Sequence, residues 1–365
     1  MEPDDFSARR TYPGTEGGPF EILLRITQPL TSFRWSGVLL FLLVIQFFIL
    51  LVQPRRLVLP FLLADWGLLA ALPKAGRSFG PNQPTTLLLA LFRLPFALLP
   101  GSWWWVWQLL GSFLVFYGFW IEPQRLTVTH EKLNISTWRE DQKVRLVHFG
   151  DLHLERWGSM EERLLKQIHS LNPDLILFSG DFLSFSHVFD RAAWQQIRRF
   201  FSRLSAPLGV FVVSGSPPVD PEKVLGEMLD GLPLRWLRDE KVRIQSSSSA
   251  FNLIGLSCSH RPSVDGDHLK DIELDDEAFT ILLYHSPDLA PVASSLGVDL
   301  QLSGHTHGGQ VTFFGKALWT PPGSGEFVSG EYQTDICPLY VSKGIGMSIL
   351  PIRFWARPEI VAYTL

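Results

Sequence analysis

The residues best suited to chemistry are aspartates and histidines that stand directly after short apolar runs. The stretch "SGHTHGGQ" sets His305 and His307 one residue apart among small residues, after the apolar run "VDLQL". It is compatible with a flexible surface turn, half of a metal site, or a glycine loop that cradles a phosphate. Three other apolar runs end in the same residue types: Asp151 and His153 follow "KVRLVHFG", Asp181 follows "PDLILFSG", and His285 follows "FTILLY".

The surrounding sequence predicts that these residues meet at one edge of a sheet. These runs and "LGVFVVSGS" are strand-like, whereas "SMEERLLKQIHSL" and "RAAWQQIRRFFSRL" have helical spacing. The first three strands therefore alternate with helices, as in βαβ units, and the loops at the carboxyl ends of such strands converge on one crevice. Side chains two residues apart in an extended chain point to the same side, so each D-x-H or H-x-H pair can act together.

The two carboxylates and four imidazoles form a donor set for metal ions. This set suits borderline metals such as Mn²⁺, Fe or Zn²⁺. Six donors exceed the need of a single tetrahedral ion that keeps an open position, but they suit two ions that share a carboxylate. We therefore interpret "SGHTHGGQ" as part of a metal site. No G-K-[ST] follows its glycines, which argues against a phosphate loop.

The composition divides the chain into an apolar N-terminal part and an ordinary globular part. The chain has 365 residues, a net charge of −4 and 19% charged residues, and its long apolar stretches lie before residue 121. Such a nearly balanced charge does not predict nucleic-acid binding. Cys258 and Cys337 lie far apart, so no disulfide framework is predicted and a reducing compartment fits best.

Residues 36–121 are predicted to form a transmembrane helical region in contact with the lipid bilayer. The preceding residues 1–35 are polar and rich in Gly and Pro, and we expect them to be disordered. The first and last of the four apolar segments are the strongest candidates for spans. The four segments are 37–52, 57–72, 85–100 and 103–120.

Asp65 and Arg93 interrupt the two middle segments. They could pair inside a helix bundle and mark a pathway, or they could be polar residues at a helix end or a kink. With four spans, both ends of the region face one side of the membrane. The excess of Lys and Arg on that side makes it cytoplasmic, together with the domain at 122–365. Three spans would reverse this orientation.

Over residues 144–365 the motifs resemble those of the calcineurin-like metallophosphoesterases, whose pattern is D-x-H, G-D-x-x-D/N, G-N-H-D/E, a lone His and G-H-x-H. The stretches "IEPQRLTVT", "GHTHGGQV" and "LYVSKGIG" with "PIRFWARPEI" are similar to the membrane-anchored bacterial branch of that superfamily. This branch includes enzymes that act on UDP-2,3-diacylglucosamine. The resemblance implies an α/β four-layer sandwich of two mixed β-sheets flanked by helices, following the transmembrane region of a multi-pass protein in the bacterial plasma membrane.

The resemblance also implies roles for the candidate residues. By similarity, one divalent ion (Mn, Fe or Zn) is held by Asp151, His153, Asp181 and His307. A second is held by Asp181, His285 and His305, with Asp181 bridging. Two ions about 3.5–4 Å apart generate a bridging hydroxide that attacks phosphorus, so no protein nucleophile is needed. The implied activity is hydrolysis of a phosphoester or phosphoanhydride in a phosphorylated small molecule or lipid, including lipid-linked and nucleotide-linked substrates.

The third motif departs from the family pattern. "VVSGSPPVD" has Ser216 and Pro217 where the family has Asn and His, and Ser184 stands where the second motif ends in Asp or Asn. Ser216 is a poor ligand, and Pro217 cannot act as a general acid, whose loss costs about 10²–10⁴ in rate. Either His187 or His260 could fold back in place of the missing imidazole.

Three functions are compatible with these features. The first is a phosphohydrolase that is slow or restricted to good leaving groups, and the second is a degenerate relative that binds a metal and a phosphorylated ligand or partner without turnover. The third is a functional membrane bundle regulated by the soluble domain. Lys343, Arg353 and Arg357 could contact an anion near the site or could be solvated at the surface.

Overall fold

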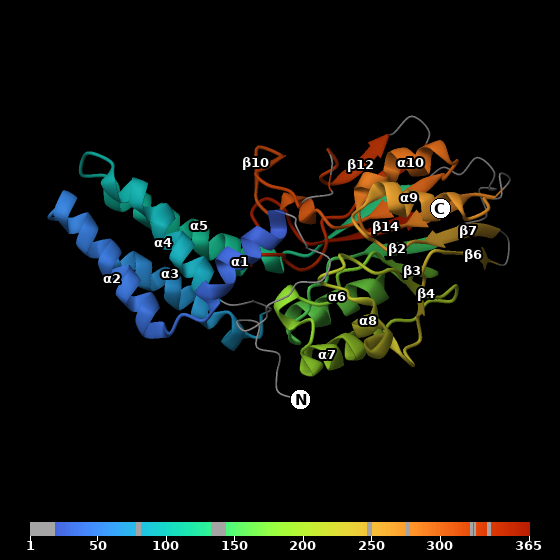
Figure 1. The fold of residues 1–365 in the computed structure, drawn as a ribbon, viewed down its shortest axis with the longest axis horizontal. Helices are drawn as coiled ribbons and strands as arrows, with labels where there is room; N and C mark the ends of the chain where they lie inside the picture. Colours follow the sequence, from blue (N-terminus) through green and yellow to red (C-terminus); the bar gives the residue numbers. More distant parts are fainter. Residues whose placement is uncertain are drawn as a thin grey trace.

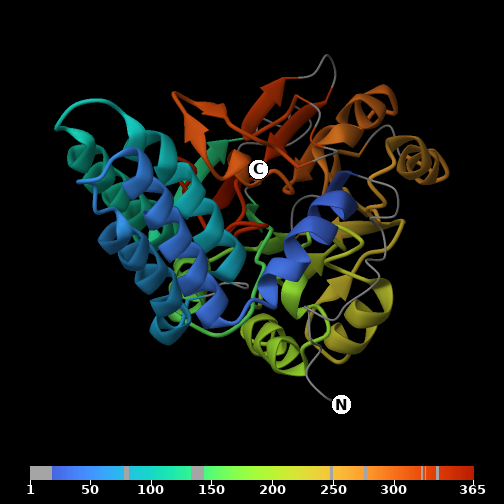
Figure 2. The same cartoon turned by 60° about the vertical axis from the view of Figure 1, so that its left-hand side comes forward.

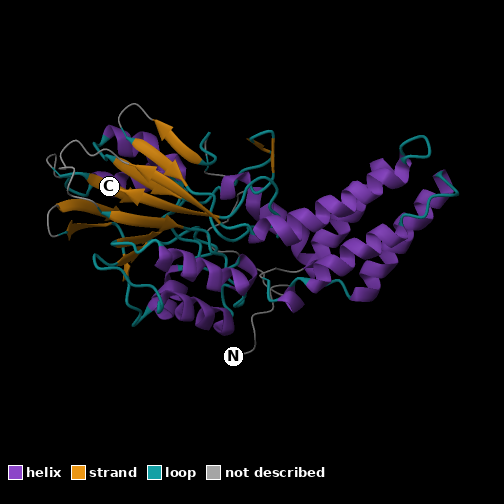
Figure 3. Ribbon diagram, turned by 180° about the vertical axis from the view of Figure 1, so that it is seen from behind, coloured by secondary structure: helices purple, strands orange, loops and turns teal. Residues whose placement is uncertain are grey.

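The computed structural model describes residues 19–77, 82–132, 144–246, 250–274, 278–321, 324, 326–333 and 337–365. These residues form an elongated molecule with helices at one end and a sandwich of two sheets at the other (Figure 1). The same division is visible from behind, where helices and strands are coloured separately (Figure 3). The change in composition near residue 121 thus corresponds to a change in architecture.

The N-terminal part of the described chain is helical. Its α-helices are α1 (Pro19–Thr31), α2 (Trp35–Val52), α3 (Leu59–Ala71), α4 (Asn82–Leu98) and α5 (Trp104–Phe116). The last helix continues through a π-helical turn at Tyr117–Ile121 and a 3-10 turn at Glu122–Gln124. Helix α1 contacts α4 and lies at the junction with the sandwich (Figure 2).

Helix α1 corrects the prediction that residues 1–35 are disordered. A helix begins at Pro19, and α2 begins at Trp35, while residues 1–18 lie outside the described residues. The run "FEILLRI" carries apolar residues at helical spacing, which favours a helix. The Gly- and Pro-rich residues before it obscured this signal.

Helices α2 and α5 coincide with the two strongest predicted spans. In the described part of the chain, two helices are long and apolar enough to cross a membrane, Trp35–Val52 and Trp104–Gln124. Helix α3 has 13 residues, and its length of about 20 Å falls short of a hydrocarbon core of about 30 Å. Helix α4 carries Arg93 and Pro95 within its apolar stretch. Two of the four predicted segments therefore qualify by length and composition.

Of the two alternatives considered for Asp65 and Arg93, the structure shows the pair inside the helices. Arg93 Nε donates to Asp65 Oδ2 at 2.6 Å and Nη2 donates to Oδ1 at 2.8 Å, and both side chains are buried. Gln108 and Ser112 of α5 accept further hydrogen bonds from the guanidinium. The bidentate geometry and these extra acceptors compensate two charges that are removed from water. The pair connects α3, α4 and α5.

Two six-stranded sheets form the C-terminal part, in the orders β1-β14-β2-β3-β4-β5 and β12-β13-β9-β8-β7-β6. Both sheets contain parallel and antiparallel pairs. The strands of the first sheet are β1 (Thr127–Lys132), β2 (Arg145–Phe149), β3 (Leu175–Phe178), β4 (Val210–Val212), β5 (Arg235–Trp236) and β14 (Glu359–Thr364). The strands of the second are β6 (Glu240–Gln245), β7 (Ala250–Gly255), β8 (Thr280–Leu283), β9 (Leu300–Ser303), β12 (Gly330–Gln333) and β13 (Pro338–Val341).

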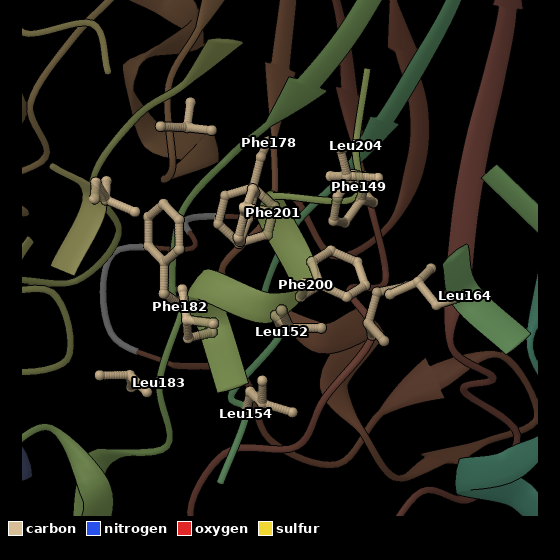
Figure 4. Close-up of a cluster of buried hydrophobic side chains, with 14 of the residues drawn as sticks. Phe149, Leu152, Leu154, Leu164, Phe178, Phe182, Leu183, Phe200, Phe201 and Leu204 are labelled. Atoms are coloured by element: carbon tan, nitrogen blue, oxygen red, sulfur yellow. The ribbon is translucent and has the colours of Figure 1, made fainter. Parts of the chain in front are cut away.

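Helices cover the outer face of each sheet. Helices α6 (Ser159–Ser170), α7 (Arg191–Phe201) and α8 (Glu222–Leu229) pack on the first sheet, and α9 (Pro262–Lys270) and α10 (Ala290–Ser295) pack on the second. Because side chains alternate along a strand, Phe149 of β2 faces the helices and Leu146 faces the other sheet. Phe200 and Phe201 of α7 pack against Phe149 and Phe178 of the first sheet in a cluster of aromatic rings (Figure 4). The predicted sandwich of two mixed sheets flanked by helices is confirmed.

Candidate metal centre

The six predicted ligands follow strands of both sheets and meet at one end of the sandwich. Asp151 and His153 follow β2, Asp181 follows β3, His285 follows β8, and His305 and His307 follow β9. All six side chains are buried. A hydrogen bond of 2.8 Å between His285 Nδ1 and the carbonyl oxygen of Ser179 joins the end of β8 to the end of β3. The strand ends of the two sheets therefore contribute to one site.

The first cluster consists of Asp151, His153, Asp181 and His307. One ligand atom from each residue lies within 4.8 Å of the others. The Nε2 atoms of His153 and His307 are 3.1 Å apart, and His153 Nε2 is 3.4 Å from Asp181 Oδ2. Two imidazole nitrogens and a carboxylate at this spacing need a proton or a cation among them, because their lone pairs repel one another.

The second cluster consists of His260, His285 and His305, with one nitrogen from each within 4.8 Å of the others. His285 Nε2 also lies 3.5 Å from Asp181 Oδ1. Asp181 therefore presents Oδ2 to the first cluster and Oδ1 to the second. The result is two adjacent donor groups that share one carboxylate.

Backbone carbonyls fix the proton positions of two of these histidines. His285 Nδ1 lies 2.8 Å from Ser179 O, and His153 Nδ1 lies 3.2 Å from Leu183 O. A carbonyl oxygen only accepts, so we assign a proton to each Nδ1, which makes Nε2 the atom of each ring that is able to bind a metal. The carboxylates of Asp181 and Asp151 raise the pKa of His285, and a bound cation would take the place of a proton on its Nε2. Burial lowers the pKa of His153 and lowers that of His260 to about 4, so both rings are neutral at pH 7.

An unpartnered carboxylate oxygen indicates that the first cluster fits a cation. Among the described residues, no hydrogen bond reaches the buried Oδ2 of Asp151, whereas Oδ1 accepts from His305 N at 2.9 Å. Burial raises the pKa of the Asp151 carboxyl, so its charged form needs a compensating positive charge. A divalent ion would supply that charge and use the facing lone pairs of His153 and His307. The residues present therefore fit a divalent metal.

Most of the candidate ligands have a left-handed backbone. A positive φ costs a non-glycine residue about 1–3 kcal/mol, and such residues cluster at functional sites. The ligands in this conformation are Asp151, His153, Asp181, His305 and His307, with φ between 43° and 72°. The fold thus holds the donor atoms in place against a conformational preference.

Asp220 holds the turn that carries Asp181, and the sequence alone did not single it out. Its buried carboxylate accepts from Asp181 N and Gly215 N at 2.7 Å and from Phe182 N at 3.1 Å. The turns after β3 and β4 are in contact through their backbones, since a Cβ on Gly180 would lie 2.5 Å from Gly215 Cα. In the sequence, the only indication of this role is that Asp220 is the acidic residue at the end of "VVSGSPPVD", just after the third motif.

Comparisons with known proteins agree with this geometry. Residues 144–309 match the family described as calcineurin-like phosphoesterase. The chain is 30% identical over 265 residues to the metallophosphoesterase YkuE of Bacillus subtilis, with 68% of this chain and 88% of YkuE covered. The chain belongs to the calcineurin-like metallophosphoesterase family. As a metallophosphoesterase, it is a hydrolase that acts on phosphoester bonds.

Two further relatives carry more specific names. The UDP-2,3-diacylglucosamine pyrophosphatase LpxG of Chlamydia muridarum is 24% identical over 316 residues, covering 66% of this chain and 91% of LpxG. The phosphodiesterase YaeI of Escherichia coli is 26% identical over 237 residues, covering 60% of this chain and 82% of YaeI. The resemblance inferred from the motifs is therefore confirmed.

In this metallophosphoesterase, the end of β4 carries Ser216 and Pro217. Ser216 N donates to Asp181 Oδ1 at 2.7 Å. Its hydroxyl oxygen lies 3.1 Å from both His285 Nε2 and His260 Nε2. Of the two histidines proposed to fold back, His260 thus reaches the site.

His187 does not join either donor cluster. Its Nδ1 lies 2.9 Å from Ser186 Oγ and 3.8 Å from Glu155 Oε1. The sequence could not distinguish His187 from His260, because both lie in loops without a family motif.

Arg353 is a buried structural residue, and neither of the roles considered for it from the sequence is correct. Its fully buried guanidinium donates to the carbonyl oxygens of residues 343, 346 and 356 at 2.6–3.0 Å, and it lies 3.4 Å from the carbonyl oxygen of His307. Lys343 pairs with Glu359 at 3.0 Å, and the half-exposed Arg357 lies 3.9 Å from Glu122. Arg353 therefore folds the loop after β13 against His307.

The same loop connects the metal centre to α5. Arg353 N donates to the carbonyl oxygen of Gly118 at 3.0 Å. The ring of Phe354 packs edge-on against Tyr117, with 5.6 Å between ring centroids. The last helix and the loop that supports His307 are thus in direct contact.

An exposed apolar surface lies next to His307 in the chain. Strands β10 (Thr312–Phe313) and β11 (Lys316–Ala317) form a hairpin soon after the 3-10 turn His307–Gly309. The hairpin lies at the end of the sandwich that faces the helices (Figures 1 and 3). We call the exposed residues in and beside it the aromatic hairpin: Phe313, Phe314, Leu318, Trp319 and Trp355, each at least 49% exposed.

Proposed function

We propose that this metallophosphoesterase is a membrane-anchored, metal-dependent phosphohydrolase that cleaves a phosphoanhydride or phosphoester of a lipid-linked or nucleotide-linked substrate. The observation that carries the proposal is the pair of adjacent donor clusters that share Asp181. When bound, two divalent ions (Mn, Fe or Zn) would polarise the phosphoryl group and activate water as the nucleophile.

The ligand assignment follows the two clusters. Asp151, His153, Asp181 and His307 would hold one ion, and Asp181, His285 and His305 would hold the other. The Nδ1 hydrogen bonds of His153 and His285 orient their rings, and Asp220 orients the turn of Asp181. Metal affinity depends on such outer hydrogen bonds as well as on the ligands themselves.

The third motif favours substrates with a good leaving group. Pro217 has no proton to give to a leaving oxygen, so the departing group must leave without help from this position. A phosphate leaving group, as in a phosphoanhydride, has a lower pKa than an alcohol and needs less protonation. We therefore expect faster cleavage of phosphoanhydrides and activated phosphodiesters than of alkyl phosphodiesters.

The exposed surface of the helices supports membrane anchoring. Helices α2, α4 and α5 expose many large apolar side chains, which a monomer in water would not tolerate as one continuous surface. Examples are Leu40, Phe47, Leu51, Phe92 and Phe113, which are 59–67% exposed. In a multi-pass arrangement the bilayer would cover this surface, and the distribution of Lys and Arg favours a cytoplasmic sandwich.

The aromatic hairpin supports a substrate located at the bilayer surface. Aromatic side chains favour the interface between lipid and water, and this hairpin faces the helices and adjoins His307. The relative LpxG is a UDP-2,3-diacylglucosamine pyrophosphatase, and such a substrate joins acyl chains to a phosphoanhydride. Both observations favour a phosphorylated lipid over a soluble metabolite.

The test uses the full chain purified in detergent and supplied with Mn²⁺. We expect hydrolysis of bis(4-nitrophenyl) phosphate and of UDP-2,3-diacylglucosamine, reduced by about 100-fold or more in Asp181→Asn. Asp267→Asn, at an exposed residue of α9 that pairs with Lys270, is the matched control and should keep wild-type activity. Equal inactivity of wild type and Asp181→Asn, with metal bound, would instead indicate a relative that binds without turnover.

A further inference from the structure

His260 lies outside the motifs of the family, yet it belongs to the second donor cluster. It stands in the loop between β7 and α9. Its ring centroid is 4.5 Å from that of His305 and 5.9 Å from that of His285, and one nitrogen of each ring lies within 4.8 Å of the others. The imidazole therefore reaches the two histidines proposed for the second ion.

The loop of His260 is held by a buried carboxylate. Asp265 of α9 accepts from Ser259 N at 2.9 Å and from Ser259 Oγ and Tyr284 Oη, each at 2.5 Å. His260 itself has φ +56°, the same left-handed conformation as the candidate ligands. A strained backbone supported by a buried hydrogen-bond network is typical of a residue placed for function.

His260 also occupies the side of the site where the family pattern loses a ligand. Ser216 replaces the asparagine of the third motif, and its neutral hydroxyl is a weak donor to a metal. The Nε2 atom of His260 lies 3.1 Å from Ser216 Oγ, as does Nε2 of His285. The imidazole is thus adjacent to the position that the missing amide would fill.

We infer that His260 is a ligand of the second divalent ion, in place of the asparagine that Ser216 replaces. This inference rests on the two-ion site of the proposed function. The second ion would then have three imidazoles and the Asp181 carboxylate, a set that favours Zn²⁺, Fe or Mn²⁺ over Mg²⁺. His260, in the loop after β7, would then supply the ligand that is missing from the loop after β4.

The test measures metal stoichiometry, independently of activity. The metal-free full chain in detergent is dialysed against Mn²⁺, bound manganese is measured by mass spectrometry, and electron paramagnetic resonance detects spin-coupled ion pairs. We expect two ions in the wild type and one ion without the coupled signal in His260→Ala, because loss of the ligand weakens the second ion on the order of 100-fold or more. The matched control is His268→Ala, at a half-exposed histidine of α9 near Asp239, and this variant should bind two manganese ions as the wild type does.

A second variant separates loss of the ligand from loss of the fold. His260→Asn keeps a residue that tolerates positive φ, and it should retain the first ion while binding the second more weakly than the wild type. Two tightly bound ions in both His260 variants would overturn the inference and leave the proposed function intact. A single ion in the wild type would also overturn it. No ion in the wild type would overturn the proposed function as well.

Discussion

Replacing Gly304 with alanine tests the position of the Asp151 carboxylate. Gly304 lies between β9 and His305 and does not have a positive φ, so alanine is compatible with its backbone. A Cβ at this position would lie 2.5 Å from Asp151 Oδ2 and 3.1 Å from Ser179 Oγ. The substitution therefore acts by steric contact with the unpartnered oxygen that we assign to the first ion.

The size of the effect follows from these distances. A carbon and an oxygen need about 3.4 Å, so Oδ2 must move by about 1 Å. Metal–ligand distances tolerate about 0.2 Å, so we expect the affinity for the first ion to fall by about 10- to 100-fold. That change corresponds to about 1.4–2.7 kcal/mol of binding free energy. Overpacking should also lower the free energy of unfolding by about 1–3 kcal/mol.

The assay is calorimetric titration of the metal-free full chain with Mn²⁺, together with thermal unfolding in the presence of a chelator. Gly226→Ala in α8 is the matched control, because a Cβ there meets nothing within 4 Å. It should leave metal binding unchanged and stabilise the helix by up to about 1 kcal/mol. If Gly304→Ala binds both ions as tightly as the wild type, the role assigned to Asp151 is wrong.

Three further predictions concern the metal, the helices and the aromatic hairpin. Adding Mn²⁺ at 100 times its Kd to the chelated protein should stabilise it by about 2.7 kcal/mol in thermal unfolding, and an unchanged Tm would contradict a structural contribution of the ions. Arg93→Met leaves Asp65 buried without its cation and should cost about 3–5 kcal/mol, whereas adding Asp65→Leu should recover much of this loss; equal stability of the single and double variants would refute the pair's role. Phe314→Ser with Trp319→Ser should lower kcat/KM for a phosphorylated lipid in vesicles and leave that for a soluble phosphodiester unchanged, and an equal loss on both would count against a bilayer contact.

The sequence predicted the structure best where residues suited to metal binding directly follow apolar runs with the pattern of strands. The candidate ligands can be grouped from the sequence, because each follows an apolar run and the carboxyl ends of strands converge. The pairing of Asp65 and Arg93 was one of two alternatives open from the sequence, because a charge in an apolar helix either finds a partner or lies at a helix end.

The positions of the loop histidines and the burial of Arg353 could not be predicted from the sequence, because they depend on loop conformation and on long-range backbone contacts. His187 and His260 have equivalent sequence surroundings, and only the network of Asp265 and Tyr284 directs His260 toward the site. The burial of Arg353 was also hidden, because its partners are backbone carbonyls, which have no sequence signature.

The contact between Arg353 and Gly118 has a practical consequence for dissecting this protein. A fragment that starts at residue 122 would retain both sheets but would lose the carbonyl that accepts from Arg353 N and the Tyr117 ring that covers Phe354. The loop beneath His307 would then lack part of its support. The last helix therefore supports the loop beneath His307 in addition to any role as an anchor. We expect a fragment that starts at residue 122 to bind metal more weakly than the intact chain.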